Sequence, residues 1–154
     1  MLRSEQEILN DLISNWISLG LEYAKGAPEI AGIYVYASSE EGESYANFLF
    51  EQGGQVCYAS NLRGVASDGR RVLQMQRLQL DDLERAETEF AGAQVPLPTE
   101  YRVYYEPATK KLDVQLSREI KYANHPFKTS VHGPEDWLDR LPKVHGKYLP
   151  LDDS

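Results

Sequence analysis

The 154-residue chain is predicted to adopt an α+β fold, in which an antiparallel sheet of five or six strands carries an N-terminal helix and one or two further helices. Apolar residues at helical spacing open the chain, three short alternating segments with tight turns follow, and a second alternating hairpin comes later. Helices and strands do not alternate one for one, so a doubly wound parallel sheet is disfavoured. The length favours one domain over residues 1–154, with a core at about 4–141 and a loop-like tail at 142–154.

The first predicted element is a helix at residues 4–24. Ser4 and Glu7 have the spacing of a capping box, in which each side chain bonds to the backbone amide of the other residue. Apolar residues then recur on one wide face, where Trp16 is expected to be a core residue. Gly26 supplies the signal that ends the helix.

An antiparallel meander of three strands is predicted next, beginning near residue 33. Along the first strand two tyrosines alternate with aliphatic residues, so the tyrosine rings would be half-buried while their hydroxyls reach water. The side of the second strand that is expected to face the core carries Ala46, Phe48 and Phe50. Gly53 and Gly54 can adopt positive φ and form the second turn, and the third strand is predicted at residues 55–61.

The remaining chain predicts a second helix, a hairpin and a short third helix. Leu80, Leu83 and Phe90 fit a helical stripe that ends at Gly92, whereas a strand or loop is an alternative at 72–78. A hairpin is then predicted by two alternating segments with a turn at residues 107–111 between them. The last helix is predicted at residues 134–141, with Pro134 at its first position.

Charge is distributed unevenly along the chain. The net charge is −8, and residues 1–100 hold 7 basic against 16 acidic residues. An acidic surface disfavours nucleic acid and suits a basic protein partner, although it also serves solubility alone. The chain has no apolar run of membrane-spanning length, no signal-peptide pattern and a single cysteine, so a cytoplasmic protein with no membrane association is expected.

No residue pattern demands a reaction, a metal or a cofactor. His125 and His132 lie seven residues apart in a loop-like region, where a shared metal or an enzymatic role is an alternative to exposed or locally bonded imidazole rings. Cys57 lies in a strand and is expected to be a buried small hydrophobic residue. Carboxylates in a hairpin turn stay solvated, which disfavours acid–base catalysis there. The chain is therefore expected not to be an enzyme.

Several motifs resemble those of the YezG-like immunity proteins of bacterial polymorphic toxin systems, a family formerly filed as a domain of unknown function. The resemblance covers roughly residues 4–141, and it rests on Tyr34 and Tyr36, the acidic turn from Ser38 to Glu43, Pro98-Thr99-Glu100, Tyr104-Tyr105 and Trp137. It implies a non-enzymatic antitoxin that binds and neutralises a cognate protein toxin, often a nuclease.

An acidic, tyrosine-rich surface is the expected contact with that toxin, since nuclease sites are cationic and tyrosine is enriched at protein interfaces. The partner-binding residues predicted on this ground are Glu40, Glu41, Glu43, Tyr34, Tyr36 and Tyr45. The alternative is a small-molecule-binding or signalling module with a pocket between the sheet and the helices. The sequence leaves the oligomeric state open.

Overall fold

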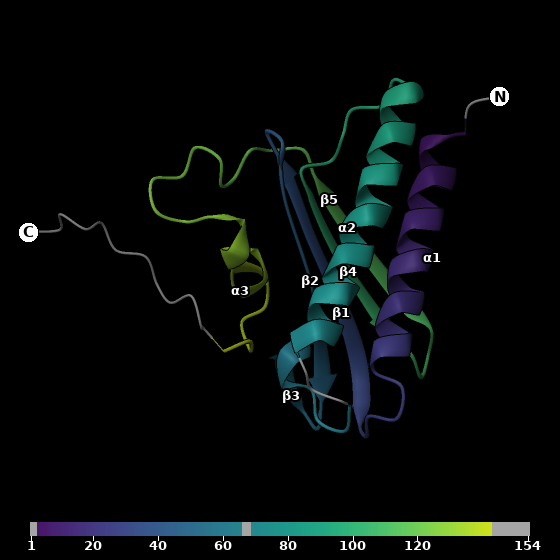
Figure 1. Ribbon diagram of the computed structural model, residues 1–154, viewed down its shortest axis with the longest axis vertical. Coiled ribbons are helices and arrows are strands. Elements are labelled where there is room, and N and C mark those ends of the chain that lie inside the picture. The colour runs from purple at the N-terminus through teal and green to yellow at the C-terminus, as the bar shows by residue number, and fades with distance from the viewer. Residues whose placement is uncertain (1–2, 66–68, 143–154) are drawn as a thin grey trace, which may run out of the picture.

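The computed structural model describes residues 3–65 and 69–142, and it has the predicted α+β class (Figure 1). A five-stranded antiparallel sheet has the strand order β3-β2-β1-β4-β5. The elements are α1 (Glu5–Tyr23), β1 (Ile30–Glu40), β2 (Glu43–Gln52), β3 (Gln55–Tyr58), α2 (Gly69–Gly92), β4 (Glu100–Glu106), β5 (Lys111–Ser117) and α3 (Gly133–Trp137), with single 3₁₀ turns at Ala59–Asn61 and Ser130–His132. Of the predicted tail at 142–154, only Pro142 lies within the described residues.

The capping box predicted for α1 is confirmed. The Ser4 hydroxyl accepts from the Glu7 amide at 3.2 Å, and the Glu7 carboxylate accepts from the Ser4 amide at 3.0 Å. Trp16 is fully buried, and its indole Nε1 donates to the carbonyl of Gln79 in α2 at 3.1 Å. The indole therefore both fills the core and ties the two long helices together.

Helix α2 is continuous from Gly69, so the strand or loop considered for residues 72–78 is wrong. The buried stripe of α2 begins at Met75 and runs through Gln79, a polar residue that hides the helical period in the sequence. Inside the core, the Gln79 amide donates to the Tyr36 carbonyl at 2.9 Å, which satisfies its buried NH₂ group. Leu73 and Leu78 are exposed, so they fall outside the stripe.

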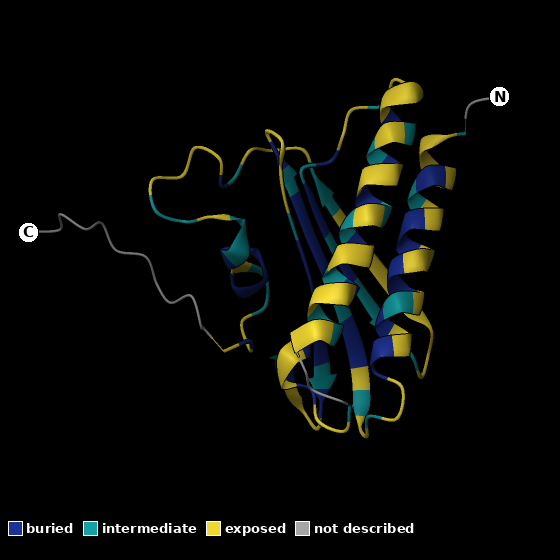
Figure 2. Cartoon of the chain, in the orientation of Figure 1, coloured by how far each residue is buried: buried dark blue, intermediate teal, exposed yellow. Residues whose placement is uncertain are grey.

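Both long helices cover one face of the sheet, with α2 over β2 and α1 over β1. The residues between the helices and the sheet are buried (Figure 2). The core between the layers is built from Ile8, Leu12, Trp16, Ile33, Val35, Ala46, Phe48, Phe50, Leu83, Phe90, Tyr101 and Val103, among others. This includes the face of β2 that was predicted to be internal. None of the helices within residues 3–65 and 69–142 is both long and apolar enough to cross a membrane.

Two element boundaries differ from the prediction. The third strand ends at Tyr58 rather than residue 61, because the chain turns into a 3₁₀ segment whose Ala59 carbonyl accepts from the Tyr23 hydroxyl at 2.9 Å. The last helix ends at Trp137 rather than residue 141, and Leu138 is already extended. This short helix lies on the face of the sheet opposite α1 and α2 (Figure 1).

Candidate protein-binding surface

The second face of the sheet is covered by residues 118–142, which we call the C-terminal segment (Figure 1). Side chains from β1, β2 and β3 form a second apolar cluster beneath it, and Leu141 is buried in that cluster. Strand alternation places Tyr34, Tyr36 and Glu40 on this same face, with Tyr45 on the neighbouring strand. Four of the six predicted contact residues therefore lie on the face that the C-terminal segment covers.

Glu40 is buried, which corrects the prediction that it forms part of a solvated acidic turn. Its carboxylate accepts from the backbone amides of Lys121 at 2.9 Å, Tyr122 at 3.0 Å and Ala123 at 2.8 Å. These three bonds compensate the desolvation of the carboxylate. Glu40 thus fastens the start of the C-terminal segment to the sheet and presents no surface to a partner.

Tyr36 is also fully buried, so the prediction that its hydroxyl reaches water is wrong. The hydroxyl donates to Glu100 Oε2 at 2.7 Å, and burial raises the pKa of the phenol far above its ordinary value. Gly133 lies so close to the Tyr36 ring that a Cβ atom at this position would overlap it. The other oxygen of Glu100 contacts Lys121 Nζ at 2.7 Å and Arg102 Nε at 3.1 Å.

Tyr34 and Tyr45 are half-buried at the edge of this covered face. The Tyr34 ring packs edge-on against Trp137 with centroids 5.6 Å apart, and it meets Tyr104 at 4.9 Å. The Tyr45 hydroxyl accepts from the side-chain amide of Asn47 at 2.9 Å. Part of each ring remains available to a partner, and Tyr45 lies two residues from Glu43 on the same side of β2.

Glu41 and Glu43 are exposed at the tip of the β1–β2 hairpin, as predicted. Glu41 and Gly42 both have positive φ, 49° and 83°, which closes a tight turn and directs the flanking carboxylates outward. These two residues are the fully exposed members of the predicted contact set.

A larger concentration of acidic side chains lies along α2 and in the adjoining groove between α1 and α2, and the sequence reasoning missed it. We call it the acidic helix groove. Asp11, Asp82 and Glu89 line the part between the helices together with Arg3 and Arg85, and Asp81 and Glu84 line a shallow hollow on α2 beside Arg85 and Glu89. Five carboxylates against two guanidinium groups leave the groove anionic. The cluster Asp81–Glu89 in the sequence signals an acidic helix surface, but only the antiparallel packing of the helices adds Asp11 to it.

Ion pairs inside the groove neutralise only part of this charge. Arg3 pairs with Asp11 and, at 3.2 Å, with Glu89, while Arg85 pairs with Asp82 at 3.1 Å. Burial raises the pKa of the Asp82 carboxyl above its ordinary value despite the adjacent arginine. Glu41 and Glu43 form a second acidic site at the tip of the β1–β2 hairpin, where the pairing of Glu43 with Glu40 places Glu43 on the sheet face opposite the helices.

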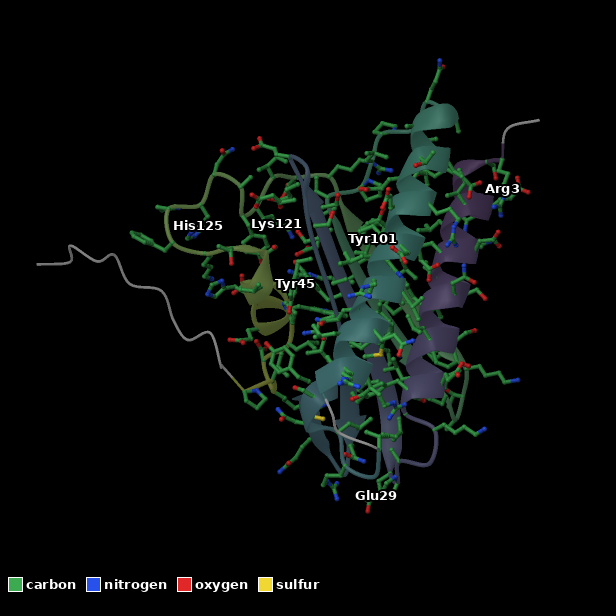
Figure 3. All side chains as sticks on the ribbon, in the orientation of Figure 1. Arg3, Glu29, Tyr45, Tyr101, Lys121 and His125 are labelled. Carbon is green, nitrogen blue, oxygen red and sulfur yellow. The ribbon has the colours of Figure 1, made fainter. Side chains whose placement is uncertain are left out.

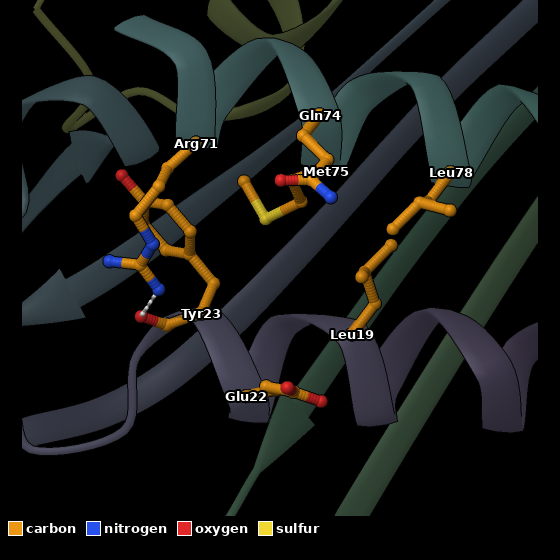
Figure 4. A pocket seen from close by; sticks show the side chains of 7 residues that line it. All are labelled: Leu19, Glu22, Tyr23, Arg71, Gln74, Met75 and Leu78. Atoms are coloured by element: carbon orange, nitrogen blue, oxygen red, sulfur yellow. Dashed lines mark hydrogen bonds between the residues drawn. The ribbon is translucent and has the colours of Figure 1, made fainter. Parts of the chain in front are cut away.

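The opposite end of the helix pair holds a small hollow instead of an anionic groove (Figure 4). Its volume is about 200 Å³, and Arg71 closes one side by donating to the Tyr23 carbonyl at 3.3 Å and lying 4.6 Å over the Tyr23 ring. Ligand pockets typically measure roughly 300–1,000 Å³. A larger groove of about 650 Å³ lies between α1 and the edge strand β5. The space between the sheet and the two helices is otherwise filled by core side chains.

His125 and His132 make local hydrogen bonds, and Cys57 lies in β3. His125 lies on an outer loop of the C-terminal segment (Figure 3), where its Nδ1 accepts from the amides of Phe127 and Lys128. His132 is buried, and its Nδ1 accepts from the Thr129 amide at 3.1 Å. Cys57 is half-buried rather than fully buried, and burial raises the pKa of its thiol. Across the described ranges, no three His, Cys, Asp or Glu side chains are grouped to hold a metal ion.

The buried tyrosines predict an alkaline unfolding transition. The pKa is raised, chiefly by burial, for Tyr34, Tyr36, Tyr45, Tyr58, Tyr101, Tyr104 and Tyr122. Unfolded tyrosines ionise near pH 10, so the unfolded state loses protons there while the folded state keeps them. Stability should therefore be complete below about pH 10 and fall as the pH rises further.

Tyrosinate absorbance and far-UV circular dichroism, followed together during alkaline titration, check this expectation. The two signals should change in one cooperative transition. Tyrosinate absorbance that rises fully while the secondary structure persists would show that these phenols titrate freely in the folded state.

Comparison with known proteins identifies no relative. No protein-family model matches the chain, and a search of curated proteins finds no significant match.

Proposed function

We propose that this chain is a non-catalytic immunity protein that binds and neutralises a cognate protein toxin in the cytoplasm. The observation that carries the proposal is the presence of two exposed acidic sites, the acidic helix groove and the hairpin tip with Glu41 and Glu43, which together we call the anionic region. A nuclease toxin grips phosphate with a cationic site, and an anionic protein surface can lie over such a site and block it. The resemblance of the sequence to YezG-like immunity proteins points to the same role.

The contact surface proposed here differs from the one expected from the sequence alone. Glu40 and Tyr36 are assigned to the fold because both are buried and hydrogen bonded. The exposed carboxylates on α2 take their place, above all Asp81 and Glu84. Complementary charge of this kind speeds the encounter of the partners and selects against wrong ones.

The test measures the affinity of the purified chain for a toxin domain sought among the genes adjacent to its own. Two double variants, Glu41→Lys/Glu43→Lys and Asp81→Lys/Glu84→Lys, each reverse two exposed charges in the anionic region. Each is expected to weaken binding by roughly tenfold or more and to flatten the dependence of affinity on salt.

The matched control is Glu22→Lys/Asp139→Lys, which changes the net charge equally at exposed positions outside the anionic region. It should leave affinity close to that of the wild type, because surface charges separated by more than about 10 Å interact weakly at moderate salt. Equal losses in all three variants would mean that net charge alone drives binding, and no loss in the first two would remove the anionic region from the interface.

A small-molecule-binding module is the second candidate, and the groove between α1 and β5 is the feature that favours it. Its volume of about 650 Å³ falls within the range of ligand sites. Native mass spectrometry of the purified chain would detect a retained ligand. A ligand displaced by substitutions in this groove would favour the second candidate over toxin binding.

A further inference from the structure

Within residues 3–65 and 69–142, strand β5 is an edge of the sheet that pairs with no further strand, and its backbone is regular. Its seven residues pair with β4 in an unbroken register, and it contains no bulge, glycine or proline. Edge strands are commonly shortened, bulged or given charged side chains, since a regular edge is a template for another strand. The charged residues of β5, Lys111 and Asp113, alternate with Leu112, Val114 and Leu116 and so lie on the face away from the helices. The opposite edge, β3, has only four residues. Of the two edges, β5 is therefore the one suited to pairing with a further strand.

The helix-facing side of β5 is apolar and incompletely covered. Leu112, Val114 and Leu116 line the groove beside α1, and Leu112 is 49% exposed. The remaining lining consists of Leu9, Ile13, Ile17 and Tyr105 with the uncharged polar residues Gln6, Asn10, Ser14 and Ser18. No charged side chain lines this groove, so an occupant needs apolar surface and would desolvate no charge on this wall.

We propose that the occupant is a second copy of this chain, which pairs its own β5 antiparallel to the first across a two-fold axis at Val114. The backbone is oriented for this pairing. The Ser117 carbonyl accepts from the Thr99 amide at 2.8 Å, on the β4 side of the strand. Because successive residues direct their backbone groups to opposite edges, the amides and carbonyls of Leu112, Val114 and Leu116 point away from β4.

The register centred on Val114 pairs every residue of the strand without conflict. Leu112 then lies opposite Leu116 of the second copy, which places apolar residues together on the helix-facing side. On the other side Asp113 lies opposite Gln115, and Lys111 opposite Ser117. A shift that centres the pairing on Asp113 would instead place this carboxylate against its own copy, which is unfavourable. The interface is self-complementary, as a two-fold dimer requires.

The charges that flank the strand are compatible with this dimer. Lys110 would approach Arg118 of the second copy just beyond the paired residues. Arg118 is already bound, because its guanidinium pairs with Glu5 at 2.9 Å and donates to the Pro96 carbonyl at 3.1 Å. The carboxylate of Glu5 therefore reduces the repulsion between Lys110 and Arg118.

Disulfide trapping tests both the dimer and its register. In a Cys57→Ser background, Val114→Cys should form a covalent dimer under mild oxidation, since directly opposed hydrogen-bonded residues have Cα atoms about 5.5 Å apart, within disulfide range. Leu112→Cys is the matched control on the same face of the strand. Its own copy would lie four residues away, roughly 13 Å along the strand, so it should not cross-link.

The control separates specific pairing from random collision, because Leu112 is the more exposed of the two positions. Faster cross-linking of Leu112→Cys than of Val114→Cys would overturn the proposed register. Sedimentation analysis of the wild type should show a concentration-dependent dimer, and Val114→Lys should be monomeric with unchanged circular dichroism. A wild type that stays monomeric at every concentration would overturn the proposal. The proposal would fail in the same way if β5 paired only with a strand of a toxin.

Discussion

Replacing Glu40 by alanine is expected to lower the free energy of unfolding by about 3–5 kcal/mol, a large effect for one residue at the end of a strand. The carboxylate is 5% exposed and accepts from three consecutive backbone amides in the C-terminal segment. Without it, the amides of Lys121, Tyr122 and Ala123 lose a charged acceptor in a site that excludes much of the water. Urea unfolding followed by circular dichroism measures the change.

Glu41→Ala is the control for this prediction, since Glu41 is adjacent in sequence and exposed. It should change stability little, because exposed carboxylates contribute little to folding. Glu40→Gln should fall between the two, since the amide oxygen can still accept but carries no charge. Equal stabilities of the Glu40→Ala and Glu41→Ala variants would show that Glu40 does not hold the segment in solution.

The second large effect is expected for Glu100→Ala, which should lower the free energy of unfolding by about 3–5 kcal/mol. Glu100 is 2% exposed and is contacted by the Tyr36 hydroxyl, Lys121 and Arg102. Removing the carboxylate leaves two cations and a buried hydroxyl without their shared partner. The loss of a partner in a buried network costs more than the net value of the interaction itself.

A double-mutant cycle with Tyr36→Phe isolates one contact of this network. The 2.7 Å bond from Tyr36 to Glu100 joins two buried residues, so their substitutions should be non-additive, with a coupling of about 0.5–3 kcal/mol. If the two residues are coupled, the double variant should lose less free energy of unfolding than the sum of the two single losses. Strict additivity would mean that the hydroxyl and the carboxylate do not interact in the folded protein.

Local patterns were enough to predict the helix and hairpin elements, because each depends on contacts between near neighbours. The capping box at Ser4 and the glycines at Gly53 and Gly54 act within a few residues, and all of them have the predicted geometry. The buried stripe of α2 was predicted only in part, since it includes the polar residue Gln79. A glutamine is expected at the surface, and the burial of this one is explained only by its bond to the Tyr36 carbonyl on β1.

The position of the C-terminal segment on the sheet could not be predicted from the sequence, and this position explains the errors in the candidate site. Glu40 bonds to residues more than 80 positions later, and its partners are backbone amides, which leave no trace in side-chain patterns. Tyr36 has an amphipathic side chain that suits a half-exposed strand, and the C-terminal segment, with Gly133 and Trp137 against the ring, covers it. The acidic helix groove likewise needs α1 and α2 to be antiparallel neighbours before Asp11 joins the acids of α2.

The most direct test of toxin neutralisation is a titration of the purified chain into a toxin domain identified among the genes adjacent to its own, with the catalytic rate of that domain as the readout. The rate should fall to zero at a fixed stoichiometric ratio, and Glu41→Lys/Glu43→Lys should require a higher concentration for the same inhibition. A toxin rate that is unaffected by excess wild-type chain, together with the absence of a complex between the two proteins, would contradict the proposed function.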